Sequence, residues 1–479
     1  MRALAIVVIS LLGCDAGSGS DPGLGPVTEA DAATVVVADA TIQLLGDRPA
    51  IPCGDVAGEV YLTPAGLPAM SPARRGDVVR CAAAGALDRA AVRSQIDAAG
   101  AGAAAVAAAE GVTIVHLAYR TMRGDGTPGV TTARAYLPAL PRAARAGAGV
   151  PVVVVGHPTT GLADRCAPSQ DPAALRDLAL PWAALGYPTI APDHAGLGNE
   201  GVHAYLDNRD AGQVMLDGAR ALRRLVGPGL GDDVLVVGYS QGGGSALSAQ
   251  ALARSYGTEG RLAGVIGFAP EWPTRLNSFG YLDLLRTPDR LTILTGVSKA
   301  AIVVLRQYAW FGMTRGEARA GEAFPAAERD AIVRAVESQC LIPLGGALQT
   351  AQPRLGELTD EALRTTLLAC ADGAACNEPG ASFHGFLTGN ILHGDPAGAP
   401  ILYLQGGSDQ ILPPAEEAAC NVAHLAADGV APEVCSDGAA THATVVQRNL
   451  AFALAWGQAA LAGGSRPRCA SSTLPACRP

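Results

Sequence analysis

Residues 234–244 read VLVVGYSQGGG, an apolar run that leads directly into a G-x-S-x-G pattern. The run at 234–237 is typical of a buried strand, and the Ala/Leu-rich stretch from Ser245 to Arg254 predicts a helix. A serine on so tight a strand-to-helix turn is exposed and strained, and only residues as small as glycine fit beside it. The helix start also directs N–H groups and a positive dipole end at the space above the hydroxyl. We therefore predict that Ser240 is a nucleophile whose attack creates an oxyanion. The pattern alone would be weak evidence in a chain with 59 glycines.

Strands and helices alternate from Val112 onward, which predicts an α/β fold with a mostly parallel sheet and helices on both faces. The first two strands form a hairpin around the Gly124-Asp125-Gly126 turn. Strands are expected at 112–119, 131–137, 152–155, 187–191, 234–237, 262–268 and 401–405, and helices at 172–185, 209–225, 414–427 and 443–462.

The strand pattern is interrupted over residues 271–395, which read as helical, with candidate helices at 299–310, 326–339 and 359–371. An insertion of this length after the sixth expected strand predicts a helical cap or lid domain. It divides the expected hydrolytic core into residues 51–270 and 396–479. The aromatic and Met side chains of the insertion fit either its own core or a lid and acyl-chain pocket; they are Tyr308, Trp310, Phe311 and Met313.

The N-terminus has the features of a processing signal. Arg2 precedes an apolar run over residues 3–12, which is shorter than the roughly 20 residues that span a bilayer. The run ends in Leu11-Leu12-Gly13-Cys14, which resembles a bacterial lipobox. Residues 1–14 are therefore expected to be a lipoprotein signal with lipidation at Cys14, and an ordinary secretory signal is the alternative. Residues 15–50 read as a flexible tether.

Eleven cysteines would leave one unpaired in a secreted protein. With lipid on Cys14, ten remain, enough for five disulfides in an oxidising compartment. Their spacing fits no structural zinc site. The expected pairs are Cys53–Cys81, Cys370–Cys376, Cys420–Cys435, Cys469–Cys477 and Cys166–Cys340.

Charge argues against a nucleic-acid partner, because the net charge is −9 and no Lys/Arg patch is interleaved with aromatic residues.

A serine nucleophile needs a histidine base and a carboxylate that orients it, in the chain order Ser, Asp or Glu, His. Asp409 follows the strand at 401–405 on a glycine-containing loop and is the expected carboxylate, with Asp395 and Asp437 as rivals. His442 lies on a loop before the last helix and is the expected base, whereas His424 falls within a helix.

Two N–H groups are needed to bind the oxyanion. One is expected from Gln241, directly after the nucleophile, and the other from the loop at 156–161, which reads GHPTTG. His157 lies in that loop and precedes Asp409, so a structural role is expected for it.

The segment GHPTTGLADRCAPS at 156–169 resembles the H-G-T-T-G…C-A-P-S loop of bacterial secretory lipases and esterases. The segment APDHAGLGNEGVHAYL at 191–206 is similar to their D-Y-x-G-L-G segment. With GYSQGG, the resemblance covers about residues 112–457 and indicates the α/β-hydrolase superfamily, in the group related to Candida antarctica lipase A. Pro158 stands where that group has a glycine.

This resemblance implies the α/β-hydrolase fold with a helical cap between the sixth and seventh strands. By position it assigns Ser240 as nucleophile, Asp409 as orienting carboxylate and His442 as base, with Thr160 and Gln241 as oxyanion donors. We expect an exported, membrane-anchored hydrolase of carboxylic esters without a cofactor or metal. A peptidase of the same fold, or an inactive surface binding lipoprotein, is the alternative.

Overall fold

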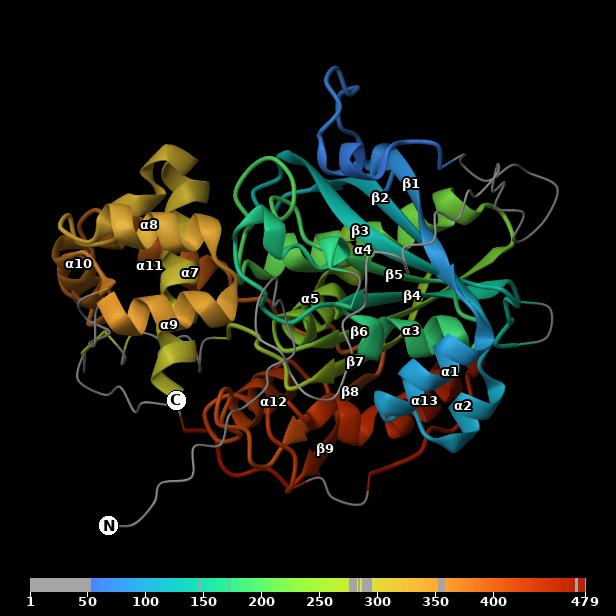
Figure 1. The fold of residues 1–479 in the computed structure, drawn as a ribbon. Coiled ribbons are helices and arrows are strands. Elements are labelled where there is room, and N and C mark those ends of the chain that lie inside the picture. The colour runs from blue at the N-terminus through green and yellow to red at the C-terminus, as the bar shows by residue number, and fades with distance from the viewer. Residues whose placement is uncertain are drawn as a thin grey trace, which may run out of the picture.

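The structure is a computed structural model. It describes residues 53–145, 148–171, 173–274, 282, 285–286, 295–351, 358–469 and 473–478. In this part of the chain a nine-stranded sheet lies between two layers of helices, and a separate group of helices stands beside it (Figure 1). The predicted α/β class is confirmed.

The sheet is antiparallel at one side and parallel at the other. Its strand order is β1-β2-β3-β5-β4-β6-β7-β8-β9, with antiparallel pairs from β1 to β5 and parallel pairs from there to β9. The strands are β1 (Val78–Leu87), β2 (Val112–Met122), β3 (Pro128–Pro138), β4 (Val150–Gly156), β5 (Thr189–Pro192), β6 (Leu230–Tyr239), β7 (Arg261–Phe268), β8 (Ile401–Gly406) and β9 (Glu433–Asp437).

The helices are α1 (Arg89–Ala98), α2 (Ala103–Ala108), α3 (Arg176–Ala184), α4 (Asn208–Val226), α5 (Gln241–Tyr256), α7 (Thr295–Arg315), α8 (Arg329–Ser338), α9 (Leu341–Ala351), α10 (Glu361–Ala371), α11 (Gly380–Gly389), α12 (Ala418–Ala427) and α13 (Val445–Ala462). Short 3-10 helices are η2 (Ala57–Tyr61), η3 (Pro72–Arg74), η4 (Asp164–Cys166), η5 (Pro168–Gln170) and η6 (Glu317–Ala323).

The central strands are apolar throughout because both of their faces are covered. In β4, Val153 and Val155 join the core under α1, α3 and α13, while Val152 and Val154 join the core under α4, α5 and α12. Successive side chains of a strand point to opposite faces, so one continuous valine run supplies both cores. Figure 1 shows these two helical layers on either side of the sheet.

Two strands escaped the sequence analysis. The first, β1, has an Ala-rich sequence and forms one edge of the sheet, and β9 is polar and forms the other. Edge strands bury little side-chain surface and therefore give a weak apolar pattern. The helical insertion follows the strand at 261–268, as expected. This strand is the seventh of the sheet and not the sixth, because the sequence analysis did not predict β1.

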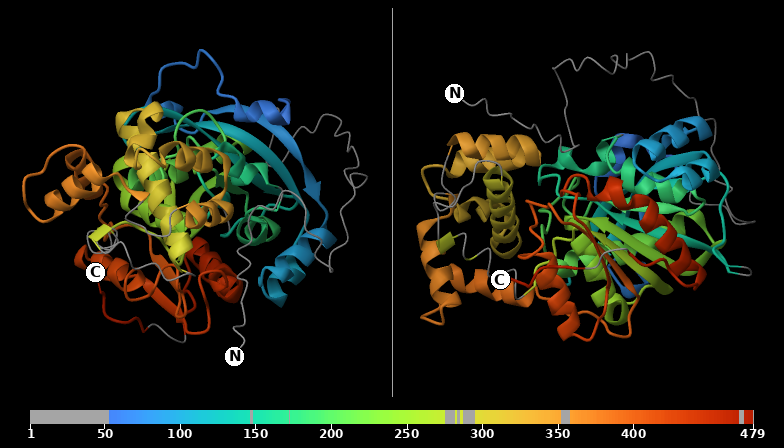
Figure 2. Two further views of the ribbon diagram at one scale, coloured as in Figure 1. Left: turned by 60° about the vertical axis from the view of Figure 1, so that its left-hand side comes forward. Right: turned by 90° about the horizontal axis from the view of Figure 1, so that it is seen from below.

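Helices α7 to α11 pack around an apolar core separate from the two cores of the sheet, and Leu162, Tyr205 and Leu206 from outside the insertion also join it. Figure 2 shows this group projecting from the side of the sheet. Tyr308, Trp310 and Phe311 are buried in that core, and Met313 packs partly buried against it. Of the two interpretations of this aromatic cluster, the structure therefore favours the one in which it forms the core of the insertion.

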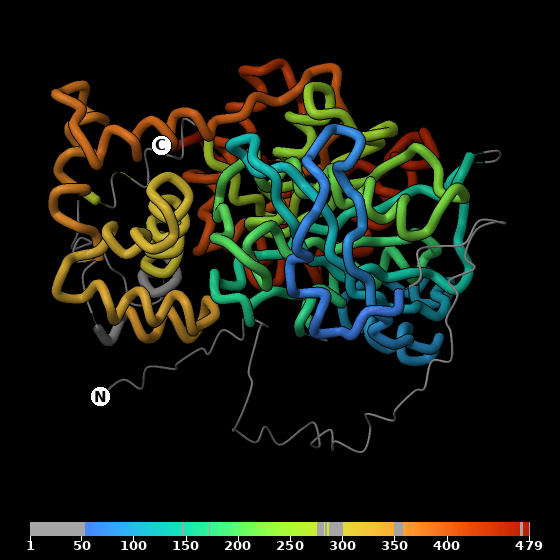
Figure 3. The backbone as a smooth tube through the Cα atoms, turned by 90° about the horizontal axis from the view of Figure 1, so that it is seen from above, coloured from blue at the N-terminus to red at the C-terminus, as the bar shows by residue number. Residues whose placement is uncertain are grey.

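The N-terminal described segment, from Cys53 to β1, packs against the sheet near β1 and β2, as Figure 3 shows from above. The expected signal at 1–14, the lipidation site Cys14 and the tether at 15–50 lie outside the described residues. Among the residues that are described, no helix is both long and apolar enough to cross a membrane.

Five disulfides use ten cysteines. Three of the expected pairs are present: Cys53–Cys81, Cys166–Cys340 and Cys370–Cys376.

The two pairs expected near the C-terminus, Cys420–Cys435 and Cys469–Cys477, are wrong, because the structure pairs Cys420–Cys477 and Cys435–Cys469. The C-terminal segment runs back past β9 to the start of α12, where the Arg478 N–H donates to the Ala415 carbonyl. Each of these cysteines therefore pairs with one that is close in space and not with the cysteine nearest to it in the sequence.

Helix α13 packs closely against α3 and against Leu235 of β6 because it carries a glycine at the contact. A Cβ at Gly457 would lie 2.5 Å from the ring of Trp182, which is fully buried and cannot move aside. Gly457→Ala should therefore lower the free energy of unfolding by about 1–3 kcal/mol.

Gly385→Ala in α11 is the matched control, because this glycine is exposed and its Cβ would meet no atom. Its helix propensity should raise stability by roughly 0.5–1 kcal/mol. Urea unfolding measures both variants, and equal stabilisation by the two substitutions would contradict the close contact.

Candidate active site

Ser240 lies between β6 and α5 with φ 55° and ψ −118°, in the left-handed half of backbone space that non-glycine residues avoid. Two backbone hydrogen bonds hold it there: its N–H donates to the Phe268 carbonyl at 2.9 Å, and its carbonyl accepts from the Glu271 N–H at 2.9 Å. The predicted strand–serine–helix turn is present. The neighbouring β7 and the start of the insertion therefore fix the serine's strained backbone.

Three predicted side chains meet at this turn. Ser240 Oγ is 3.0 Å from His442 Nε2, and His442 Nδ1 is 2.8 Å from Asp409 Oδ2. When the carboxylate accepts the Nδ1 proton, Nε2 is left free to accept the serine proton. All three residues are at least 93% buried, so bulk water is largely excluded from this relay.

The Asp409 carboxylate is held from two sides. Its Oδ1 accepts from the N–H groups of Ile411 and Leu412 at 2.9 and 2.8 Å, and its Oδ2 also accepts from Gln405 Nε2 at 3.3 Å. The loop after β8 thereby closes around the carboxylate and aims one oxygen at the imidazole. The sequence did not predict this supporting role of Gln405, which reads only as a residue of the strand.

The rivals weighed for the acid and the base lie elsewhere. Asp437 is bound by Arg448 at 2.6 Å, and this hydrogen bond lowers its pKa. Asp395 pairs with Arg254 at 2.6 Å. His424 lies in α12, with Nε2 2.8 Å from the Leu392 carbonyl oxygen. None of these contacts leads to Ser240.

Tyr239 supports the imidazole from the strand side, a role that the sequence analysis did not foresee. Its hydroxyl donates to the His442 carbonyl at 2.8 Å, and the two ring centroids are 5.1 Å apart. Burial and the charge of Asp409 raise the pKa of this phenol, which therefore remains a donor. The side chain before Ser240 thus positions the predicted base.

The two predicted oxyanion donors lie on adjacent segments. Gln241 is the first residue of α5, where backbone N–H groups have no partner within the helix. Thr160 follows β4, and a Cβ at Gly242 would lie only 2.2 Å from the Gly156 carbonyl carbon. This near-contact brings the loop after β4 against the start of α5.

Three buried histidines lie side by side here, His157 in this loop and His194 and His203 on the segment between β5 and α4. His157 Nδ1 donates to the Pro158 carbonyl at 2.6 Å, and its Nε2 is 3.1 Å from the Asp193 carbonyl oxygen, which agrees with a structural role. Burial lowers the pKa of His194 and His203 well below the ordinary value, so both are neutral. Their rings stack at 5.3 Å, and His203 Nε2 is 2.9 Å from the Gln241 side-chain amide.

Glu271 is a titratable group that the sequence analysis missed. Burial raises its pKa to about 7, against the opposing charges of Arg306 in α7 and of His442 and a hydrogen bond with Tyr205. Glu271 therefore interacts both with His442 at the serine turn and with Arg306 of the helical insertion. A carboxyl group with this pKa changes charge near neutral pH.

A cavity of about 830 Å³ lies away from the relay, between the β2–β3 turn, residues 63–70 and helices α7 and α11. Arg123 and Asp210 on its wall form an ion pair at 2.6 Å. Ser240, His442 and Asp409 are not among its lining residues. Its size therefore gives no information on the substrate of the relay.

The sheet order, the serine turn and the inserted helices are those of the α/β-hydrolase fold. A sequence model of the family described as secretory lipase matches residues 178–271, which run from α3 through the serine turn to Glu271. The resemblance inferred from the sequence is confirmed. A search of curated proteins gave no match.

Solved structures show the same fold. Candida antarctica lipase A in its closed state aligns with a TM-score of 0.62 at 17% identity, covering 90% of each chain. The rice cell wall degrading esterase LipA from Xanthomonas oryzae aligns with a TM-score of 0.56 at 21% identity, covering 81% of this chain and 97% of its own. A putative hydrolase from Legionella pneumophila aligns with a TM-score of 0.58 at 17% identity, covering 78% and 96%.

The family match indicates a hydrolase that acts on an ester. Together with the five disulfides it also indicates an extracellular protein, because disulfides persist in oxidising compartments.

Asp409→Asn should lower kcat for a nitrophenyl ester by about 10⁴-fold, because the amide stabilises the wrong imidazole tautomer. Asp437→Asn is the matched control, since this carboxylate is bound to Arg448. Its rate should stay close to that of the unaltered protein. Equal losses in the two variants would contradict the assignment of Asp409.

Glu271→Gln should change the pH dependence of stability. Glu271 has a raised pKa when folded, so the native state binds this proton more tightly than the unfolded chain does. Its contribution to stability is therefore present at low pH and is lost as pH rises from the ordinary value of 4.5 to about 7. The free energy of unfolding should fall less between pH 5 and 8 in the variant, as urea titrations would measure.

The control is Glu59→Gln, which removes an exposed carboxyl. It should leave the difference between pH 5 and pH 8 unchanged. Parallel pH profiles for Glu271→Gln and the unaltered protein would contradict a raised pKa at Glu271.

Proposed function

We propose that the protein is an exported serine hydrolase that cleaves carboxylic esters, of lipid or acyl type, through an acyl-enzyme. The observation that carries this proposal is the unbroken relay from Ser240 Oγ through His442 to Asp409, with contacts of 3.0 and 2.8 Å. The secretory lipase match, which includes the serine turn, supports esters as the substrate class.

In the first half of the reaction, His442 Nε2 takes the proton of Ser240 as Oγ attacks the carbonyl carbon of the ester. The carbonyl oxygen becomes an oxyanion, which the N–H groups of Thr160 and Gln241 stabilise. The bond to the alkoxy group then breaks, and His442 returns the proton to the leaving alcohol.

In the second half, His442 takes a proton from water as the water attacks the acyl carbon. The bond to Ser240 Oγ breaks, the proton goes to Oγ, and the carboxylic acid leaves. The buried Asp409 carboxylate stabilises the imidazolium that forms in both halves. This chemistry needs no metal and no cofactor.

We propose that residues 271–395 act as a cap over this relay and that residues 51–270 and 396–479 form the catalytic core. Two observations support the proposal: Ser240 is only 6% exposed, and the Arg306 side chain of α7 influences the Glu271 carboxyl beside the serine turn. An ester must reach a buried hydroxyl, so the cap has to shift when substrate binds.

We also propose that Cys14 carries a lipid that anchors the protein to a membrane, with residues 15–50 as the tether. The disulfides support this proposal because they pair the ten other cysteines with one another. An ordinary secretory signal at 1–14 would release the protein instead. Mass spectrometry of the mature N-terminus distinguishes the two.

Ser240→Ala should lower the hydrolysis of nitrophenyl esters by several orders of magnitude, because the three residues act as a unit. A fluorophosphonate probe should label the unaltered protein at Ser240 and leave the variant unlabelled. Ser245→Ala is the matched control, since this buried serine in α5 donates only to the Gln241 carbonyl. It should keep both the labelling and the rate.

Each alternative has its own result in this experiment. Faster cleavage of peptide nitroanilides than of esters of any chain length would favour a peptidase. A folded protein that no fluorophosphonate labels would be a binding lipoprotein. Hydrolysis by Ser240→Ala at the unaltered rate would exclude Ser240 as the nucleophile.

A further inference from the structure

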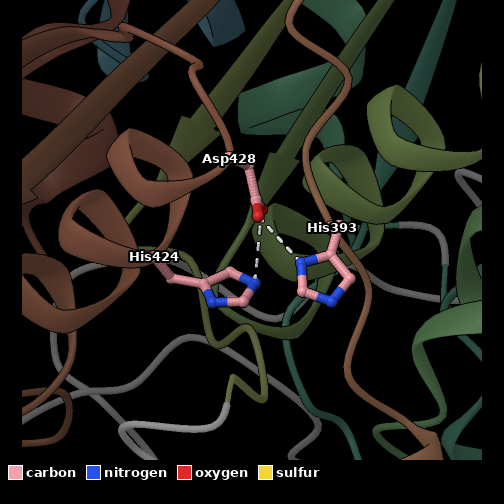
Figure 4. Close-up of side chains that lie close together, drawn as sticks. All are labelled: His393, His424 and Asp428. Atoms are coloured by element: carbon pink, nitrogen blue, oxygen red, sulfur yellow. Dashed lines mark hydrogen bonds and ion pairs between the residues drawn. The ribbon is translucent and has the colours of Figure 1, made fainter.

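Two histidines and an aspartate, none of them part of the relay, converge at one point (Figure 4). His393 lies between α11 and β8, His424 lies in the last turn of α12, and Asp428 caps the C-terminal end of that helix. His393 Nδ1 is 2.8 Å from Asp428 Oδ1, and His424 Nε2 is 3.5 Å from Asp428 Oδ2. Figure 4 shows both rings directing a nitrogen at the carboxylate.

The three donor atoms suit a transition metal. Two imidazole nitrogens and one carboxylate oxygen are ligands that zinc takes at about 2.0–2.2 Å, usually with a fourth ligand that completes a tetrahedron. The donor atoms here all lie within 4.8 Å of one another, so small side-chain rotations bring them around one ion. The exposed His393 leaves room for water as a further ligand.

The charge balance also favours a cation. A carboxylate at a helix C-terminus faces the negative end of the helix dipole, which is unfavourable. In the described part of the chain the ion pairs of Asp428 are with the two histidines alone, and its other contact is the Gly394 N–H at 2.8 Å. With neutral imidazoles the cluster carries one negative charge, which a divalent ion would offset.

Two existing contacts oppose binding. His393 Nδ1 donates to Asp428 Oδ1 at 2.8 Å when no ion is present, so its proton must move to Nε2 before Nδ1 can bind a metal. His424 Nε2 lies 2.8 Å from the Leu392 carbonyl and donates to it when no ion is present. A metal at Nε2 requires the imidazole proton to move to Nδ1, and this hydrogen bond is lost. The Leu392 carbonyl then lies beside the ion.

The cluster connects both ends of the helical insertion to the core. Trp272, one residue after the serine-bound Glu271, is fully buried, and its ring meets the His424 ring edge-on at 5.5 Å. His393 and Gly394 lie where the chain returns from α11 to β8. An ion held here would fasten residues 393–394, where the chain returns to the core, to α12. The ion would lie close to Trp272, where the chain leaves the core.

We propose that His393, His424 and Asp428 bind one zinc ion that stabilises the base of the insertion. This role is separate from ester hydrolysis, so the site can exist whether or not Ser240 is a nucleophile.

The test uses the full folded protein without a histidine tag, stripped with EDTA and dialysed. Calorimetric titration with zinc chloride should show one equivalent bound, and zinc should raise the Tm. Cobalt(II) in its place should give a visible absorption band of tetrahedral intensity.

His393→Ala and Asp428→Asn should each weaken zinc affinity by roughly 10–100-fold or more and remove the rise in Tm. His393 is the better choice because its side chain is 72% exposed, so that its loss leaves the fold intact. His384→Ala is the matched control, since this histidine lies in α11 outside the cluster. It should bind zinc as the unaltered protein does.

Zinc binding equal in His393→Ala, Asp428→Asn and the unaltered protein would place the ion elsewhere and overturn the proposal. So would the absence of stoichiometric binding by the unaltered protein. Ester hydrolysis is measured in parallel, and its loss in Ser240→Ala alone would leave the zinc result unaffected.

Discussion

The structure depends on how closely helix α5 approaches its neighbours. A Cβ at Gly238 would lie 1.9 Å from the Gly242 carbonyl oxygen, and one at Gly244 would lie 1.9 Å from that of Glu271. Any larger residue at these positions would push the helix away from β6 and from the segment after β7. The same close approach sets the strained backbone of Ser240 and brings the first N–H groups of α5 against the loop after β4. The position of the proposed nucleophile is therefore a consequence of main-chain packing, and the neighbouring side chains only orient its hydroxyl.

A second constraint joins that loop to the insertion. The Thr160 carbonyl accepts from the Leu341 N–H at 2.8 Å, Gly161 forms a β-bridge with Cys340, and Cys340 is disulfide-bonded to Cys166. Three contacts within a few residues hold the junction of α8 and α9 on the segment that carries Thr160. Because the disulfide is covalent, this corner of the insertion remains in place when other parts move. This corner of the proposed cap and the proposed oxyanion loop therefore form one mechanical unit in an oxidising compartment.

The sequence predicted the parts of this molecule that have strong local signals. The valine runs of β4 and β6 and the glycines around Ser240 specify buried strands and a tight turn, whatever the rest of the chain does. Edge strand β1, with its Ala-rich sequence, has no such signal, and the pairing of Cys420 with Cys477 depends on the path of the C-terminal segment. The positioning roles of Tyr239 and Gln405 were missed for the same reason. The role of Tyr239 depends on a hydrogen bond to His442 on a distant loop, and that of Gln405 on how the loop after β8 folds back onto its own strand. No local sequence pattern encodes either contact.

The way the chain leaves the core limits where the insertion can move. Glu271 donates its N–H to the Ser240 carbonyl, and the indole N–H of Trp272 donates to Ser248 Oγ inside α5 at 3.1 Å. Displacing either residue would break a hydrogen bond to the turn that carries Ser240 or expose a fully buried indole. A hinge before Trp272 would thus disturb Ser240 each time the insertion moved. Movement that admits substrate and preserves the relay must therefore begin beyond Trp272. The proposed zinc site lies beside Trp272 and would hold this residue in place.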